Sequence, residues 1–264
     1  IIIYPIKSCG MFEVKSWAIS SSGFLYDREW SLINSENKVL QQKKYKQMAQ
    51  LKCSIDLTTN ILHVSYGKNS LDINIYYTPE ESVIQKQCVY TTEGYVYSDE
   101  INKWFIDCLD ITCKLVRTAH SRQIESTEKK LSFSNEGQFL LVNNKSIEDI
   151  NNKGNFNYNY TRYRPNIVIT TNAAYDEDIW DSIDIDNSNA RLKVFKKCPR
   201  CVMVNISQDD KDKLDERNNN KFEPLKTLSK YRREKGTISF GILLYIEYGS
   251  YLTVGDKLNI NYKK

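Results

Sequence analysis

Short segments of alternating apolar and polar residues, separated by turn residues, dominate the first third of the chain. They occupy residues 12–19, 29–34, 54–58, 61–66 and 71–77. A period of two is typical of strands that bury one face, and closely spaced strands favour a sandwich or a barrel. Intervening stretches such as 21–23 and 67–70 contain the glycine, serine and asparagine that tight turns use. The sequence therefore predicts a β-rich fold for this part of the chain.

The remainder of the chain mixes helices with strands. A helix is predicted over residues 98–109, because Ser98 suits an N-cap and Ile101 shares one face with Trp104. Further helices are predicted after Ser146 and after Pro224. Strands are predicted at 138–143, 166–170, 192–195, 202–206 and 238–248, and polar surface loops at 151–161 and 207–221. The Cys pair described below lies in this part, so we expect a division near residue 117 into regions 1–117 and 118–264.

Charge, hydropathy and cysteine usage limit the class of protein. The 264 residues carry 37 basic and 33 acidic side chains, a net charge of +4, without a basic cluster typical of nucleic-acid or membrane-surface binding. No apolar run approaches the roughly 18 residues that span a bilayer. Seven scattered cysteines indicate a reducing, cytoplasmic location. The chain starts with a strand-like IIIYPIKS and without methionine, so we expect a longer natural protein.

The sequence KCPRCVMVNI contains the pair Cys198 and Cys201, with Arg200 beside the second thiol. A zinc site needs four ligands, and a thioredoxin-like pair precedes a helix; neither context is present. The flanking apolar residues predict a turn between two strands. A thiol beside a fixed positive charge favours the thiolate, which suits a soft metal or sulfur transfer. The alternative for Cys201 is a buried structural thiol. Nothing requires Cys198 to react, and the roles open to it are to shape the turn or to guard the other thiol.

Cationic residues at predicted strand edges form a second candidate group. They are Lys7 (followed by Ser8), Arg28, Arg162, Arg164 and Arg200. Arginine forks suit phosphate, so these residues could converge on a polyanion; the alternative is ordinary surface cations. Arg162 and Arg164 are predicted to share one strand face, where two like charges cost stability unless an anion binds. The two histidines, His63 and His120, are isolated and give little support to a histidine metal site.

Several motifs together resemble one family. YPIKSCG, GFLYDREW, VLQQKK, FLLVN, RYRPNIVI, EDIW, KCPRCVMVNI and PLKTLSKYRR occur here in the order seen in MOSC proteins. The resemblance covers nearly the whole chain. It implies a mainly β (α+β) fold, a MOSC-type β-barrel with an N-terminal β-rich MOSC subdomain and a few peripheral helices. It also implies binding of the molybdenum cofactor, molybdopterin.

The resemblance assigns roles to individual residues. It implies that Cys201 is both the molybdenum ligand and the catalytic thiol. The cofactor-binding residues that it implies are Lys7, Ser8, Arg28, Arg162, Arg164, Asn166 and Arg200. The chain departs from the family after the Cys motif, where residues 206–211 lack the usual glycine-containing turn.

The sulfurase branch of this family is the one that the chain resembles most. Its members hold the cofactor while a persulfide sulfur replaces an oxo ligand on molybdenum. The implied partners are a pyridoxal-phosphate cysteine desulfurase domain, absent from this sequence, and acceptor molybdoenzymes such as xanthine dehydrogenase and aldehyde oxidase. Two alternatives stay open: a molybdenum-dependent reductase of N-hydroxylated compounds, and a non-catalytic interaction domain whose Cys pair is structural.

Overall fold

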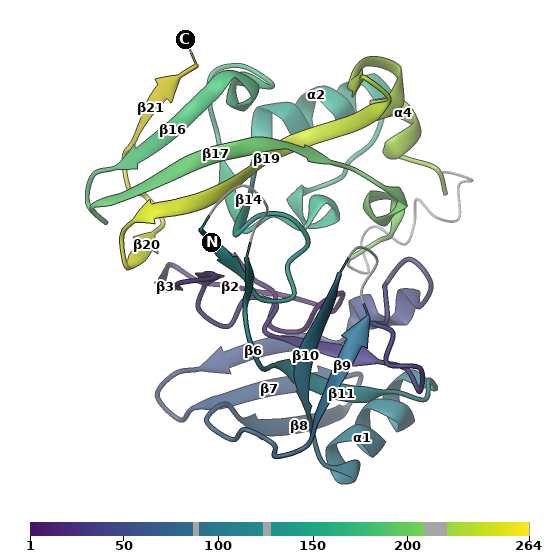
Figure 1. The fold of residues 1–264 in the computed structure, drawn as a ribbon. Helices are drawn as coiled ribbons and strands as arrows, with labels where there is room; N and C mark the ends of the chain where they lie inside the picture. Colours follow the sequence, from purple (N-terminus) through teal and green to yellow (C-terminus); the bar gives the residue numbers. More distant parts are fainter. Residues whose placement is uncertain (87–89, 124–127, 209–220, 264) are drawn as a thin grey trace. The chain divides into compact units, whose positions relative to one another are not determined.

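A computed structural model describes residues 1–86, 90–123, 128–208 and 221–263 of the chain (Figure 1). The chain forms two compact units. Unit 1 comprises Ile1–Ile2, Val14–Leu25 and Glu136–Lys264, and unit 2 comprises Ile3–Glu13 and Tyr26–Asn135. The division predicted at residue 117 falls inside a strand of unit 2, β11 (Lys114–Thr118).

A seven-stranded sheet forms the framework of unit 1. Its order is β15-β14-β19-β17-β16-β21, with β18 paired to β19. The strands are β14 (Phe139–Asn143), β15 (Ile167–Ile169), β16 (Trp180–Ile185), β17 (Ala190–Pro199), β18 (Arg233–Glu234), β19 (Thr237–Tyr248) and β21 (Leu258–Tyr262). β14 and β15 run parallel and the other pairs run antiparallel. The long strands β17 and β19 pair in the middle of this sheet.

Helices cover one side of this sheet. α2 (Asn144–Gly154) packs on β14, α4 (Leu225–Tyr231) packs on β19, and the two helices contact each other (Figure 1). Ile147, Ile150 and Leu228 meet Val142 and Phe240 of the strands in one apolar core. Short 3-10 helices lie between these elements: η2 (Tyr160–Tyr163) after α2, η3 (Asp176–Ile179) after β15, and η4 (Val202–Asn205) after β17. A three-stranded sheet in the order β20-β3-β4 completes unit 1 with β3 (Ser16–Ser20), β4 (Gly23–Phe24) and β20 (Tyr251–Thr253).

Unit 2 is built from antiparallel sheets and one described α-helix. A four-stranded sheet has the order β5-β11-β10-β9, and a three-stranded sheet has the order β6-β7-β8. The strands are β5 (Trp30–Ile33), β6 (Lys52–Asp56), β7 (Ile61–Tyr66), β8 (Asn69–Asn74), β9 (Ser82–Lys86) and β10 (Thr91–Val96). α1 (Asp99–Leu109) packs on β11 and β8. Short elements complete the unit: β1 (Ile2–Ile3), which straddles the division, β2 (Phe12–Glu13), η1 (Lys46–Gln50), β12 (Arg122–Gln123) and β13 (Lys130–Leu131).

The structure confirms the predicted mainly β fold and corrects several local assignments. Residues 61–66 form a strand as predicted, and the helix predicted over 98–109 is α1. The strand predicted at 202–206 is wrong. These residues form η4, in which the amide of Val204 donates to the Cys201 carbonyl at 3.2 Å. Apolar runs of this length carry no period that separates a strand from a buried turn.

The polar segment 151–161 is only partly a loop. α2 continues through its first four residues to Gly154, and Tyr158 is buried. Within the segment predicted as a loop at 207–221, residues 209–220 lie outside the described residues. No helix among the residues that the structure describes has the length and apolar character needed to cross a membrane.

Candidate functional site

Cys201 lies where β17 ends and η4 begins. It occupies the N-cap position of η4 and is exposed to solvent, whereas Cys198, three residues earlier in β17, is only 8% exposed and belongs to the apolar core. The predicted strand-to-strand turn is therefore wrong, because a 3-10 helix follows the pair. Burial raises the pKa of the Cys198 thiol, so this thiol is the less reactive of the two.

The described residues around Cys201 do not form a protein-only metal site. Among them, no group of three or more histidine, cysteine, aspartate or glutamate side chains is placed to hold a metal ion. A structural metal needs about four protein ligands.

Arg200 is held by main-chain oxygens and has one unused donor. Its Nε donates to the Phe240 carbonyl at 2.8 Å, and its Nη1 donates to the Tyr163 carbonyl at 2.9 Å. Its Nη2 is buried and has no hydrogen-bond partner among the residues that the structure describes. Gly241 (φ +72°) stands beside this atom, and a Cβ there would lie 3.5 Å from Nη2 and 2.5 Å from the Leu141 carbonyl. Glycine thus permits the close approach of the Leu141 carbonyl beside a fixed cation, whose third nitrogen makes no hydrogen bond within the described part of the chain.

Arg162 and Arg164 do not share a strand face as predicted. Arg162 lies in η2 and Arg164 caps it in a left-handed conformation with φ of 53°. Arg162 is only 2% exposed, donates from Nη1 to the Asn205 carbonyl at 3.1 Å, and stacks 3.8 Å from the centre of the Tyr158 ring. The Arg164 Nη1 donates to Oε1 of Gln208 at 2.9 Å. The turn directs the two guanidinium groups to different partners.

The turn η2, the end of β17 and η4 form one local assembly, which we call the arginine–thiol site. It consists of Arg162, Arg164, Arg200 and Cys201. The Arg200 bond to the Tyr163 carbonyl joins η2 to the Cys pair, and the Arg162 bond to Asn205 joins η2 to the segment that follows Cys201. Three of the predicted cations and the predicted thiol therefore come from directly bonded segments of unit 1.

Asn166 has a structural position in the same unit. Its side-chain Oδ1 accepts from the Leu140 amide at 3.3 Å, and its Nδ2 donates to the Ile2 carbonyl at 3.1 Å. The residue is 1% exposed. Its side-chain amide links β14 to the first residues of the chain, so both its oxygen and its nitrogen form hydrogen bonds within the fold.

Lys7, Ser8 and Arg28 belong to unit 2. The Lys7 Nζ donates to the Phe133 carbonyl at 2.6 Å and to the Asn135 side chain. Ser8 is buried and has a left-handed backbone with φ of 65°. The lysine ammonium is therefore bound to the segment that ends unit 2.

Arg28 is paired with a buried carboxylate. It forms an ion pair with Asp27, and its guanidinium lies 4.6 Å from the centre of the Tyr4 ring. Asp27 also accepts from the Tyr4 amide at 2.8 Å. Arg28 itself has a left-handed φ of 51°. Such a conformation is uncommon in residues other than glycine, asparagine and aspartate, and it often marks a ligand site.

Two charged residues with clear structural partners were missed by the sequence analysis. Arg122 donates from Nη2 to the Ser134 carbonyl at 3.0 Å and lies 3.9 Å from the centre of the Tyr90 ring. In unit 1, Arg232 binds Asp178 at 2.7 Å, and both side chains are 10% exposed. Arg122 stands in no motif, Arg232 lies in the motif PLKTLSKYRR without having been singled out, and their partners are distant in sequence. No local pattern could have identified them.

Two family models match the chain. The model described as "MOSC N-terminal beta barrel domain" matches residues 1–112, and the model described as "MOSC domain" matches residues 128–259. Both matches lie in the order that the sequence motifs predicted, and the second contains the arginine–thiol site.

Relatives with a common description match almost the whole chain. The protein named "Molybdenum cofactor sulfurase" from Oryza sativa is 34% identical to this chain. The match includes 94% of this chain and 32% of the rice protein. The proteins of the same name from Arabidopsis thaliana and Bombyx mori are 32% and 30% identical over 98% and 92% of this chain, and 34% and 31% of theirs. The chain thus spans about a third of the length of these curated relatives.

One solved structure, a solution structure of a Bordetella bronchiseptica protein, is also similar in part. It covers 38% of this chain and 84% of that chain, with 15% identity and a TM-score of 0.29. A similarity at this level does not bear on the fold.

Proposed function

Because the chain belongs to the MOSC domain family, we propose that it binds the molybdenum cofactor and presents it for sulfur transfer to molybdenum. In this proposal the cofactor is the substrate of the reaction, and this chain is the domain that binds it. The observation that carries the proposal is the buried Nη2 of Arg200, a fixed cationic donor without a partner among the described residues, in the residue directly before the exposed Cys201. An anionic ligand that also bears a thiophilic metal would use both groups.

The chemistry of the residues fits this substrate. Molybdopterin carries a phosphate and supplies sulfur ligands to its own metal, so the protein needs only one further donor. The absence of a multi-residue metal cluster in the described parts of the chain is compatible with that requirement. Cys201 would provide the thiolate, which is the soft ligand that such a metal accepts. Arg200 would provide a charge-assisted hydrogen bond to an anionic oxygen, for which a guanidinium fork is well suited.

The other arginines of the site would act by position. Arg162 anchors η2 to the residues after Cys201, so it fixes the main chain on which the thiol stands. Arg164 donates from Nη1 to the side chain of Gln208, and in the proposed complex a phosphate oxygen would accept from this guanidinium. When bound, the cofactor supplies the metal at which sulfur replaces oxygen; the residues of this chain bind, orient and enclose it.

The assignment to sulfur transfer is favoured by the names of the relatives, which are called molybdenum cofactor sulfurases. The chain spans only about a third of those proteins, so the sulfur donor is proposed to lie elsewhere. A pyridoxal-phosphate cysteine desulfurase domain as donor, xanthine dehydrogenase and aldehyde oxidase as acceptors, and a cytoplasmic location are parts of the same proposal. The assignment of Lys7, Ser8 and Arg28 to the cofactor is also a prediction, which the left-handed backbone at Ser8 and Arg28 supports.

The test measures cofactor content after expression in a host that makes molybdopterin. Molybdenum is determined by mass spectrometry and pterin by fluorescence of its oxidised form. We expect both in the wild type, molybdenum but not all pterin lost in Cys201→Ser, and pterin reduced about tenfold or more in Arg200→Lys, because a hydrogen bond to a charged group contributes roughly 1.5–3 kcal/mol.

Matched controls separate the site from general damage. Cys108→Ser changes a half-buried thiol of unit 2, and Arg232→Lys changes an arginine paired with Asp178. Both should keep the wild-type pterin and molybdenum content. A wild type without pterin would refute cofactor binding and favour a structural interaction domain. Loaded protein that reduces an amidoxime with a cytochrome b5 electron supply would instead favour the reductase alternative.

A further inference from the structure

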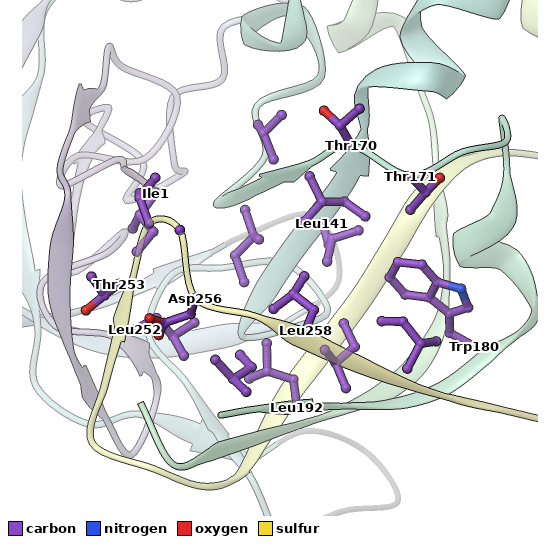
Figure 2. A pocket seen from close by; sticks show the side chains of 18 of the residues that line it. Ile1, Leu141, Thr170, Thr171, Trp180, Leu192, Leu252, Thr253, Asp256 and Leu258 are labelled. Atoms are coloured by element: carbon purple, nitrogen blue, oxygen red, sulfur yellow. The ribbon is translucent and has the colours of Figure 1, made fainter. Parts of the chain in front are cut away.

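A cavity of about 500 Å³ lies inside unit 1, against the seven-stranded sheet. Three groups of elements surround it: β14 and β15, then β16, β17 and β21, and finally the segment from Leu252 to Asp256. Figure 2 shows Leu141, Trp180 and Leu192 around the same space, with Ile1 on another side of it. Walls from separate elements make this a cavity within one unit rather than an open sheet face.

Part of the cavity wall is apolar and buried. Leu141 and Trp180 are 0% exposed, and Ile183 and Leu192 are 1% exposed. Ligand pockets are lined mainly by apolar side chains and have volumes of roughly 300–1,000 Å³, a range that includes this cavity.

The polar groups at the edge of the cavity already have partners within the chain. Asp176 accepts from the Trp180 indole at 3.2 Å, and Thr171 Oγ1 accepts from the Asn143 amide at 2.7 Å. Asp256 accepts from Ser188. No lysine or arginine occurs among the described residues that line the cavity. A phosphate or carboxylate ligand would therefore find two carboxylates and no cation, so the cavity does not suit the anionic cofactor.

The edge strands of the sheet set a further limit on what can enter. β15 and β21 both line the cavity, and each pairs with a single neighbour in the sheet. β15 has only three residues, Ile167–Ile169, so its free edge can form few main-chain bonds with an added peptide strand. The cavity therefore favours a small molecule held by apolar contact over a peptide held by backbone pairing.

We propose that this cavity is a binding site for an uncharged aliphatic molecule, separate from the arginine–thiol site. Neither Cys201 nor the three arginines of that site line it. The ligand would be recognised by the burial of its alkyl chain, with the hydroxyl or other neutral end near the threonine and aspartate edge. Binding at this site requires no cofactor, so this proposal does not depend on the proposed function.

The test uses 1-decanol as the probe and follows its binding by calorimetry and by the fluorescence of Trp180, which lines the cavity. We expect saturable binding of one molecule per chain. From 1-hexanol to 1-decanol the affinity should rise about fourfold per added methylene, until the cavity is full. Decanoate should bind more weakly than decanol, since its charge meets the two carboxylates.

Filling the cavity provides the decisive variant. Ile169→Phe places a larger side chain on β15, where Ile169 lines the cavity, and should weaken decanol binding at least tenfold. Ile179→Phe makes the same change at a residue that is 56% exposed and does not line the cavity, and should bind like the wild type. No saturable binding, equal binding by Ile169→Phe, or equal affinity for decanoate would each overturn the proposal. Pterin content should be unchanged in Ile169→Phe, which distinguishes this test from that of cofactor binding.

Discussion

Two of the predicted anion-binding cations, Arg200 in unit 1 and Arg28 in unit 2, are held in different ways. In unit 1, Arg200 is fixed by the carbonyls of Phe240 and Tyr163, and no described carboxylate neutralises it. In unit 2, Arg28 is paired with the buried carboxylate of Asp27. Carbonyl groups orient a guanidinium and leave its charge in place, whereas a carboxylate cancels it. The first arrangement leaves a charge that the proposed anionic ligand could use, and the second neutralises the charge within the fold.

Replacement of Arg162 should produce the largest loss of stability in this comparison. Arg162→Met leaves the Asn205 carbonyl without its donor and removes the stacking on Tyr158, so we expect about 2 kcal/mol less unfolding free energy. Chemical denaturation measures the loss, and hydrogen exchange should place it in unit 1. Arg164→Met removes a bond to a side chain and should cost about 0.5 kcal/mol or less. Equal losses in the two variants would contradict an anchoring role for Arg162.

Replacement of Arg28 tests the opposite arrangement. Arg28→Met leaves Asp27, whose side chain is 4% exposed, with a buried charge that is no longer paired. We expect a loss of about 1–2 kcal/mol, confined by hydrogen exchange to unit 2, because unpaired buried charges are costly. The double variant Asp27→Asn, Arg28→Met should recover part of the loss. If the single variant is as stable as the wild type but has lost pterin, the main role of Arg28 is to bind the ligand and not to stabilise the fold.

Lys7 should show a smaller effect of the same kind. Lys7→Met removes hydrogen bonds to the Phe133 carbonyl and the Asn135 side chain, for which we expect about 1 kcal/mol. Thermal unfolding measures the change. Lys68→Met at an exposed turn provides the matched control and should leave the melting temperature unchanged. A loss in the control as large as in Lys7→Met would show that the bonds of Lys7 contribute nothing specific.

A pH series gives the smallest expected effect and concerns unit 1. Glu177 is 0% exposed, and burial raises its pKa above the ordinary value of 4.5, although Asn143 and Ser146 donate to it. The folded protein then holds this proton more tightly than the unfolded chain. Its stabilising contribution is complete below pH 4.5 and is lost as pH rises through the raised pKa. Denaturation between pH 4 and pH 8 should show a smaller decline for Glu177→Gln than for wild type. Parallel curves would exclude this carboxyl as a source of pH dependence.

Local patterns correctly predicted the elements in which burial of one face gives the sequence a regular alternation of apolar and polar residues. The alternation in residues 61–66 and the single apolar face of residues 98–109 identified β7 and α1, because burial of one face imposes a period of 2 or 3.6 on the sequence. Strands such as β9, β10, β16 and β21 were missed, and the apolar run at 202–206 was assigned to the wrong element. A short run has too few residues to define a period, so its conformation depends on what packs against it.

The sequence by itself determined the family, the mainly β fold and the identity of the candidate thiol, since those follow from motifs and periodicities along the chain. Only the tertiary structure decided that Arg162 lies in a 3-10 turn and Arg164 caps it, and that Cys198 is buried while Cys201 is exposed. It also decided which nitrogen of Arg200 stays unused. The reason is that such a hydrogen bond joins two atoms from distant segments in a specific geometry, as between Arg200 and the Tyr163 carbonyl. The sequence around one partner contains no pattern that identifies the other.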